Sequence, residues 1–519
     1  MKRDLRRLAD TAYDVLVVGG GIHGACVAWD AALRGLSVAL VERGDFGHAT
    51  SSNSLKIVHG GLRYLQDADL GLVREMIRER TAFMRIAPHL VHPLPCVMPT
   101  YRRLARSRLA MRIALAVNDL VGADRNRLED PLKRLPAGRI VSREECLRLL
   151  PGMADRGLTG GALWYDAQMY NSERLTLSFV LSAEGLGATV ANYLEAVDIL
   201  RTGSRVVGVR ARDVLGDQSL DIRAKVVVNA TGPWVDRVLD LVGGGRRNGG
   251  GRLSVAMNLV TRQIVPEYAA GVPAVDGSGG VVGGTGRGSR LLFIAPWRDR
   301  SLIGTLHAPH DGKPEDCRVS AEDVQRFLDE VNAAYPGAGL RLEDVSLVHS
   351  GLLPTVDGGP TDGLKLVRRS QIRDHRRVDG IDGLISVVGV KYTSARSAAQ
   401  RVVDLVFRQL GVEPPACASA ATPLRGGWIP RLGDYLARET AARPAGLPAE
   451  VVRHLVLSRS YATCAQCTEM ESCKKLDTLL SRICDLVFCS HRMDNLREIR
   501  RVGSERFAAQ FHEAKQPSG

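Results

Sequence analysis

The sequence predicts an α/β fold built around a parallel β-sheet, and the N-terminal residues carry the evidence. Residues 14–18 form an apolar run that ends in glycines, and residues 37–41 form a second apolar run that ends in Glu42. Both runs are typical of buried parallel strands. Between them, apolar residues recur at helical spacing over residues 22–33, and Gly35 stands where a helix would stop. The pattern is a strand, a glycine turn, a helix and a second strand.

The glycines of this turn follow the G-x-G-x-x-G pattern at Gly19, Gly21 and Gly24. Such glycines allow a tight turn, a close approach of backbone to a pyrophosphate and close packing of helix on sheet. The helix N-terminus offers N–H groups to phosphates, and the Glu42 carboxylate can accept hydrogen bonds from ribose hydroxyls. The turn therefore predicts dinucleotide binding, with an ordinary glycine turn as the alternative.

A polar segment after the second strand favours FAD over NAD as the dinucleotide. The glycine turn lies near the N-terminus and is followed by GDFGHATSSNSLKIVHGGLRYL, which is rich in glycine and hydroxyl groups. Thr50, Ser51 and Ser52 can supply hydroxyl and backbone N–H groups to a second stretch of cofactor. A solvated loop is the alternative.

Composition and charge narrow the class of protein. The chain has 519 residues and a formal net charge of +13, which favours anionic partners. Its basic residues are dispersed without interleaved aromatic residues, so nucleic acid is not expected as a partner. No run of 18 or more apolar residues occurs, so no spanning helix is expected. Cysteines scattered through most of the chain indicate a reducing, cytoplasmic compartment.

Two segments leave alternatives open. Residues 101–122 are basic and partly amphipathic, which suits either peripheral contact with anionic lipid at the inner face of the membrane or a packed helix with a solvated basic face. Near the C-terminus, clustered cysteines that include a CxxC pair fit either a metal site or a chance group of thiols, and we assign no metal ligand. These cysteines are Cys464, Cys467, Cys473, Cys484 and Cys489.

The N-terminal motifs resemble a known family. The segments VLVVGGGIHGACVAWDAALRGLSVALVERGDF and ATSSNSLKIVHGGLRYL are similar to those of the FAD-dependent glycerol-3-phosphate dehydrogenases and oxidases, which share the D-amino-acid-oxidase-type fold. The similarity is dense over residues 14–66 and recurs in blocks to about residue 400. The resemblance implies FAD as the cofactor and a role in glycerol metabolism.

The resemblance also implies the domain organisation. A discontinuous Rossmann-type FAD domain, of the two-dinucleotide-binding class, alternates along the chain with a mixed α+β substrate-binding domain. The FAD domain is expected at residues 12–66, 170–236 and 380–412, and the substrate-binding domain at residues 67–169 and 237–379. Residues 413–519 are expected to form a helical C-terminal region, which begins with a linker over residues 414–430 because proline, glycine and small residues dominate there.

Two later blocks resemble family segments that pass close to the cofactor. NATGPWVD follows an apolar strand at residues 224–228, and GVKYTSAR follows another at residues 384–388. A helix with Ser394 as its N-cap is expected to run from there to about residue 410. The resemblance implies that Lys391 faces the pyrimidine side of the flavin, where its charge favours the anionic reduced form. The other cofactor-binding candidates in these blocks are Ala230, Gly232, Gly389 and Thr393.

The resemblance implies oxidation of a secondary alcohol, glycerol 3-phosphate to dihydroxyacetone phosphate, with hydride transfer to flavin N5. Such a reaction needs a base for the hydroxyl proton and an oriented C–H bond. His59 matches the family histidine that faces the substrate, and an imidazole suits the base because its pKa lies near neutrality. Lys56, Arg63 and Arg396 are candidates for holding an anionic group. Quinone, oxygen and a carrier protein remain open as electron acceptors.

Three blocks depart from the family on the substrate side. Leu353 stands where the family's SGxRP block has arginine, residues 254–258 read SVAMN in place of a KGxH-like segment, and residues 303–307 read IGTLH in place of an IGTTD-like block. These departures favour either a redistributed phosphate site or a different small hydroxy or amino compound as the substrate. Candidates for a redistributed site are Arg262, Arg287, Arg290, Arg298 and Arg396.

An RNA-binding flavoprotein and a non-catalytic flavin-bound sensor are further alternatives. The sequence contains no RNA-binding module, which argues against the first. The presence of His59 and Lys391 favours turnover over a purely sensory role, although retained residues alone do not prove activity.

Overall fold

A parallel strand–helix–strand unit begins the fold, as the sequence predicts. β1 (Ala12–Val18) pairs in parallel with β2 (Val38–Val41), and α2 (Ile22–Leu33) connects them. Gly35 follows α2 with φ +84°, the left-handed conformation that favours glycine after a helix. The predicted unit is confirmed.

The structure is a computed structural model that describes residues 3–102, 107–243, 252–274, 291–356, 365–443 and 448–459. These residues belong to one compact unit, Met1–Tyr461. The five cysteines within the described part are free thiols. The cysteine cluster, Cys464, Cys467, Cys473, Cys484 and Cys489, lies outside the described residues.

The first sheet has eight strands, and its centre is parallel. Its order is β17-β18-β10-β1-β2-β7, with β9 also paired to β10 and β8 paired to β9. β18, β10, β1, β2 and β7 run parallel to one another, whereas β17, β9 and β8 are antiparallel to their neighbours. The bounds are β7 (Thr189–Ala191), β8 (Leu194–Thr202), β9 (Arg205–Asp213), β10 (Ser219–Asn229), β17 (Gln371–Asp374) and β18 (Leu384–Val388). The carboxyl ends of β1, β2, β10 and β18 therefore meet at one edge.

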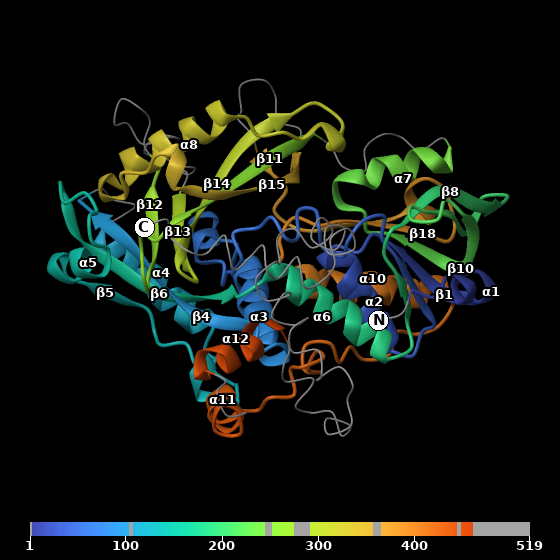
Figure 1. Ribbon diagram of the computed structural model, residues 1–519, viewed down its shortest axis with the longest axis horizontal. Coiled ribbons are helices and arrows are strands. Elements are labelled where there is room, and N and C mark those ends of the chain that lie inside the picture. The colour runs from blue at the N-terminus through green and yellow to red at the C-terminus, as the bar shows by residue number, and fades with distance from the viewer. Residues whose placement is uncertain are drawn as a thin grey trace, which may run out of the picture. The chain divides into compact units, whose positions relative to one another are not determined.

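The second sheet has ten strands and is largely antiparallel. Its order is β16-β15-β11-β14-β13-β12-β4-β6-β3, and β5 pairs with β6. Figure 1 shows β12, β13 and β6 on the left and β1, β10 and β18 of the first sheet on the right. The bounds are β3 (Ile57–Val58), β4 (Val91–Tyr101), β5 (Arg139–Val141), β6 (Leu158–Met169), β11 (Leu253–Arg262), β12 (Ala269–Pro273), β13 (Leu291–Trp297), β14 (Arg300–His310), β15 (Val345–Val356) and β16 (Lys365–Leu366).

Two short strands join the sheet opposite to the one expected from their place in the chain. β3 lies within the segment expected to belong to the FAD domain, yet it pairs with β6 of the second sheet. β17 lies within the segment expected to belong to the substrate-binding domain, yet it pairs antiparallel with β18 of the first sheet. Both strands stand where the chain passes from one sheet to the other, so their pairing is set by tertiary contacts and not by local sequence.

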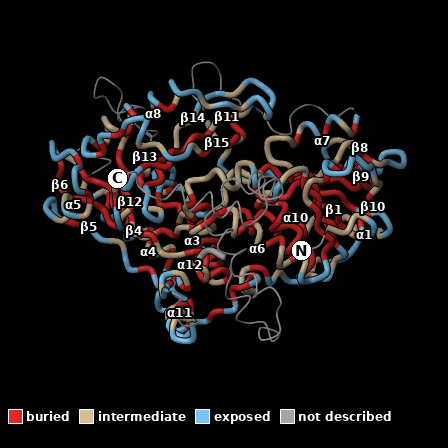
Figure 2. Tube along the Cα trace, in the orientation of Figure 1, coloured by how far each residue is buried: buried red, intermediate tan, exposed pale blue. Residues whose placement is uncertain are grey.

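Helices cover both faces of the first sheet. α2, α6 and α10 pack on one face, whereas α1, α7 and the β8–β9 hairpin cover the other. Buried residues follow β1, β10 and α10 in Figure 2. The remaining helices are α1 (Leu5–Asp10), α3 (Leu70–Ile86), α4 (Arg108–Val121), α5 (Arg143–Leu149), α6 (Ser172–Gly185), α7 (Val235–Val242), α8 (Ala321–Ala334), α9 (His375–Val378), α10 (Ala395–Gln409), α11 (Leu432–Ala441) and α12 (Ala449–Arg459).

Residues 414–430 do not form the free linker that their composition suggests. They contain no helix or strand, but the Leu424 side chain is fully buried in the core that α2 and α6 share. The Leu424 N–H also donates to the Ile86 carbonyl oxygen at 2.8 Å, at the end of α3. The linker interpretation is therefore wrong, because this segment supplies both an apolar side chain and backbone hydrogen bonds to the body of the fold. α11 and α12 follow it, within the part expected to be helical.

Residues 101–122 contain α4, which buries one side and exposes apolar residues on another. Met111 and Leu115 are buried, whereas Leu109, Ile113 and Leu120 are largely exposed. None of the helices in the described part of the chain is long and apolar enough to cross a membrane.

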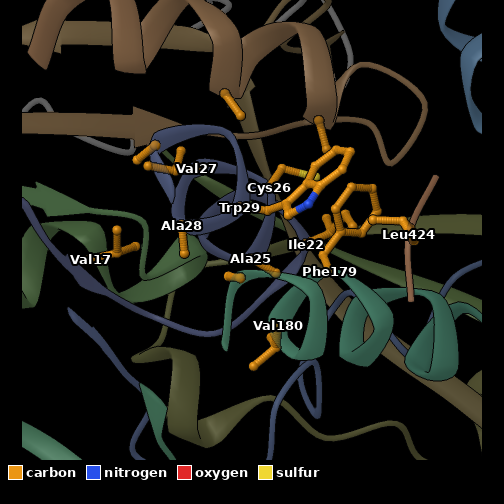
Figure 3. Packing of buried hydrophobic residues seen from close by; sticks show 14 of the residues in the cluster. Val17, Ile22, Ala25, Cys26, Val27, Ala28, Trp29, Phe179, Val180 and Leu424 are labelled. Carbon is orange, nitrogen blue, oxygen red and sulfur yellow. The ribbon is translucent and has the colours of Figure 1, made fainter. Parts of the chain in front are cut away.

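Trp29 anchors the packing of α2 on α6. It is 1% exposed, and its ring meets Phe179 edge to face with centroids 5.2 Å apart. Figure 3 shows this pair beside Leu424 and Ile22. Buried aromatic side chains of this size contribute a large part of the stability of a core.

Replacing Trp29 tests this packing. W29A should lower the free energy of unfolding by about 3–5 kcal/mol, because it removes a buried ring and leaves a cavity. The matched control is W428A, since Trp428 is 61% exposed, and that change should be close to neutral. Denaturant unfolding of both variants would measure the difference, and equal effects would contradict the assigned core.

Candidate active site

The glycine turn after β1 is held by contacts that exclude side chains. Gly19 has φ +104°, and a Cβ on it would lie 2.7 Å from the Ala230 carbonyl oxygen. A Cβ on Gly24 would overlap the Gly19 carbonyl oxygen. Glycine is therefore required at both positions, and the ends of β1 and β10 and the first turn of α2 lie in direct backbone contact.

The first turn of α2 presents its backbone N–H groups at this edge. The N-cap residue of α2 is Gly21, which has no side chain with which to cap the helix. Ser51 Oγ accepts the Ile22 N–H at 3.0 Å, so one predicted cofactor residue instead completes the helix end. The turn thus forms a backbone cradle with helix N–H groups directed to a ligand, which fits the pyrophosphate of FAD.

Glu42 lies beside this cradle, at the end of β2. Its carboxylate accepts the Gly20 N–H at 2.7 Å and the Gly44 N–H at 2.8 Å. Each carboxylate oxygen can accept more than one hydrogen bond, so the group is oriented by the backbone and can still bind a ribose. That role stays a prediction.

The other hydroxyls of the polar loop bind protein atoms. Thr50 Oγ1 donates to the Leu352 carbonyl of β15 at 3.1 Å, and Ser52 Oγ donates to the His48 carbonyl at 2.9 Å. These hydroxyls hold the loop in place and tie it to the second sheet. Their lone pairs can still accept hydrogen bonds, so the cofactor contacts of this loop stay a prediction.

The later cofactor candidates lie near the same edge. Gly232 has φ +60° and starts the short helix after β10. A Cβ on Gly389, directly after β18, would overlap the His23 ring of α2. Thr393 is buried, and its Oγ1 accepts the His59 N–H at 3.2 Å. Ser394 stands at the N-cap position of α10, but its side chain does not cap the helix, so that prediction is wrong in its detail.

His59 lies beside Lys391 and Tyr64. The His59 and Tyr64 ring centroids are 5.9 Å apart, and Lys391 Nζ lies 5.1 Å from the Tyr64 ring. Burial lowers the pKa of His59 to about 4, with Asp166 opposing this shift and Lys391 adding to it. His59 is partly exposed, and because its pKa is lowered to about 4 its imidazole is neutral at physiological pH.

A hydrogen bond to a backbone carbonyl holds the amine of Lys391. Its Nζ donates to the Arg368 carbonyl oxygen. Burial and the charge of Arg63 lower the pKa of Lys391 to about 8, so the amine is still largely protonated at pH 7. Arg63 is exposed, and its guanidinium lies 5.6 Å from the Tyr64 ring. His59, Lys391 and Arg63 are thus brought together around one aromatic residue.

A buried carboxylate that the sequence analysis missed fixes the turn that carries His59. Asp166 Oδ1 accepts the Gly60 N–H at 2.5 Å and the Arg80 Nη1 at 3.0 Å. Asp166 Oδ2 accepts the Trp164 Nε1–H at 3.1 Å. An aspartate within the apolar run of β6 was the signal available in the sequence, because buried carboxylates are retained only where they are paired.

Lys56 and Arg396, which the resemblance suggested as anion ligands, are buried in ion pairs instead. Lys56 Nζ donates to Glu173 at 2.8 Å and to Ser172 Oγ at 3.0 Å. Arg396 binds both carboxylate oxygens of Glu79, at 2.8 and 2.5 Å. Separating such buried pairs would leave an uncompensated charge, so we omit both residues from the proposed anion site.

Two positions of the second sheet at which the sequence departs from the family pattern, Asn258 and Leu353, carry uncharged side chains. Asn258 accepts the Thr305 hydroxyl at 2.7 Å and donates to the Asn53 carbonyl at 3.3 Å. Leu353 pairs in register with Ser254. Of the arginines suggested as substitutes, Arg262 binds Asp344 and Arg298 stacks on Trp297. Arg287 and Arg290 lie outside the described residues.

Comparison with known proteins shows the family to which the chain belongs. Residues 14–405 match the family model described as FAD dependent oxidoreductase. The chain is 34% identical to a glycerol-3-phosphate dehydrogenase of Synechocystis sp., over 82% of this chain and 75% of that protein. It is 32% identical to an alpha-glycerophosphate oxidase of Streptococcus pyogenes over 78% of this chain, and it spans 64% of that protein's length.

A solved structure is also similar. The glycerol-3-phosphate dehydrogenase of Bacillus halodurans, complexed with FAD, matches with a TM-score of 0.68 and 26% identity, over 92% of this chain and 82% of that chain. The expected FAD-binding α/β fold is therefore confirmed.

The cradle can be tested through Gly24. G24A should yield protein that lacks bound flavin, because the added methyl group overlaps the Gly19 carbonyl and displaces the helix N-terminus. G185A is the matched control, since a Cβ on Gly185 meets no atom within 4 Å. The flavin absorbance per protein of the two purified variants would decide, and retention of flavin by G24A would contradict the assigned cradle.

Proposed function

The chain belongs to the family of FAD-dependent oxidoreductases, and we propose that it oxidises the secondary alcohol of glycerol 3-phosphate to a ketone. The placement of His59 carries this proposal. A partly exposed, neutral imidazole lies beside a protonated lysine, on a turn fixed by Asp166 and next to the residues that follow β18. The activities named for the relatives support the substrate.

His59 acts as the base in this proposal. When bound, FAD would supply a hydride acceptor, its N5, for the alcohol carbon. The hydroxyl proton must leave in the same step, and a neutral imidazole can accept it. Because the pKa of His59 is lowered to about 4, the imidazole is unprotonated over the whole neutral range. Asp166 and Thr393 hold the backbone on either side of the ring and so orient it.

Lys391 and Arg63 supply the positive charge of the site. Both lie around Tyr64, which is beside His59. A positive charge beside a bound flavin favours the negative charge that reduction adds. The same charges can attract an anionic substrate, with Arg63 as the exposed group.

A different small hydroxy or amino compound is the second candidate substrate, and Leu353 favours it. An alkyl side chain at this position offers no hydrogen bond to a phosphate.

We also include peripheral contact with an anionic membrane surface in the proposal. α4 exposes Leu109, Ile113 and Leu120, and arginines lie on the same helix.

Anaerobic addition of substrate to the purified flavoprotein tests the function. Glycerol 3-phosphate should bleach the flavin absorbance, and H59N should slow this reduction by a factor of about 10²–10⁴ while leaving the flavin bound. H310N is the matched control, because His310 is a partly exposed histidine of β14 that bonds the Lys313 carbonyl. Bleaching by another hydroxy or amino compound alone would move the assignment to that compound.

The pH dependence of kcat/KM provides a separate test. Activity should fall below about pH 4, where His59 becomes protonated, and above about pH 8, where Lys391 loses its charge. K391R should remove the alkaline limb, because a guanidinium keeps its proton to beyond pH 12. An alkaline limb unchanged in K391R would exclude Lys391 as its source.

A further inference from the structure

One carboxylate of the second sheet binds two residues that flank the glycine turn. Glu315 lies in a short 3-10 helix (Pro314–Asp316) between β14 and α8. Its Oε1 accepts the Trp234 Nε1–H at 2.7 Å and the Arg43 Nη1–H at 3.3 Å. The Arg43 guanidinium also stacks on the Trp234 ring, 4.0 Å from its centroid. We call Arg43, Trp234 and Glu315 the clasp.

The clasp reaches across the carboxyl end of β1. Arg43 follows Glu42 directly after β2, and Trp234 follows the turn after β10. β1 lies between β10 and β2 in the sheet. Neighbouring strands are about 4.8 Å apart, so the ends of β2 and β10 are separated by about 10 Å. The side chains of Arg43 and Trp234 must therefore span the end of β1, from which the glycine turn projects.

This edge is where a dinucleotide binds in an open parallel sheet. The glycine turn and the first turn of α2 form the predicted pyrophosphate cradle, and Glu42, next to Arg43, is the predicted ribose ligand. We propose that the clasp retains FAD by closing over the adenosine half of the cofactor. The proposal depends on the binding of FAD and not on the identity of the substrate.

The clasp is a network and not a single surface ion pair. Isolated exposed ion pairs stabilise little, because water screens them. Here one oxygen accepts three donors, since Arg237 Nη1 also donates to Glu315 at 3.1 Å, and Arg237 binds Glu195 in turn. Stacking on Trp234 restricts Arg43 further. Glu315 lies in the connection after β14, and Figure 1 shows that this connection comes near α7. Because Arg237 of α7 binds Glu315, the network also links the second sheet to the first.

Release of FAD from the holoenzyme tests the proposal. Dilution of purified wild type, E315Q and R43Q would be followed by the rise in fluorescence of free flavin. Each variant should release FAD about five-fold faster than wild type, as expected from the loss of a weak polar network. E343Q is the matched control, because Glu343 lies in a comparable 3-10 helix of the same sheet and pairs only at the surface, with Arg341. Its release rate should equal that of wild type.

Coupling within the clasp gives a second readout. R43Q/E315Q should release FAD no faster than the single variants, because both changes open the same contact. Added salt should accelerate release from wild type more than from E315Q. Wild-type release rates in E315Q, an equal acceleration in E343Q, or additive effects in the double variant would each overturn the proposal. Flavin bleaching by substrate is measured separately, so failure of the clasp and failure of the proposed reaction are distinguishable.

Discussion

The backbone contact between the glycine turn and the end of β10 is the constraint on which the rest of the structure depends. Gly19 touches the Ala230 carbonyl, and Gly24 touches Gly19, so no side chain fits between β1, α2 and β10. This contact sets α2 close against the sheet and leaves its first N–H groups at the carboxyl edge. Every other part of the candidate site, including Glu42, is arranged around that edge.

Polar contacts then join the two sheets around the cradle. Thr50 binds the backbone of β15, Asp166 of β6 binds the turn that carries His59, and Glu315 binds residues beyond β2 and β10. All three groups are paired and Asp166 is also buried, which favours one relative placement of the sheets over others. The two sheets therefore belong to a single compact unit, although the chain passes between them several times.

Two cations of the site lie around one aromatic ring. Lys391 and Arg63 both lie near Tyr64, which is beside His59. Lys56 and Arg396 are cations too, but their ion pairs serve the fold. An anionic substrate would therefore be attracted toward the cations beside His59.

Local sequence by itself determined the strand–turn–helix–strand unit, because apolar periodicity and glycine placement act within a few residues of one another. The motifs that surround His59 and Lys391 also marked both residues as candidates. Only the tertiary structure decided that Arg396 pairs with Glu79, 317 positions away, and that Glu315 reaches Arg43 across 272 positions. Charged side chains have several possible partners along a chain, and folding selects among them by distance and burial, which sequence spacing does not encode.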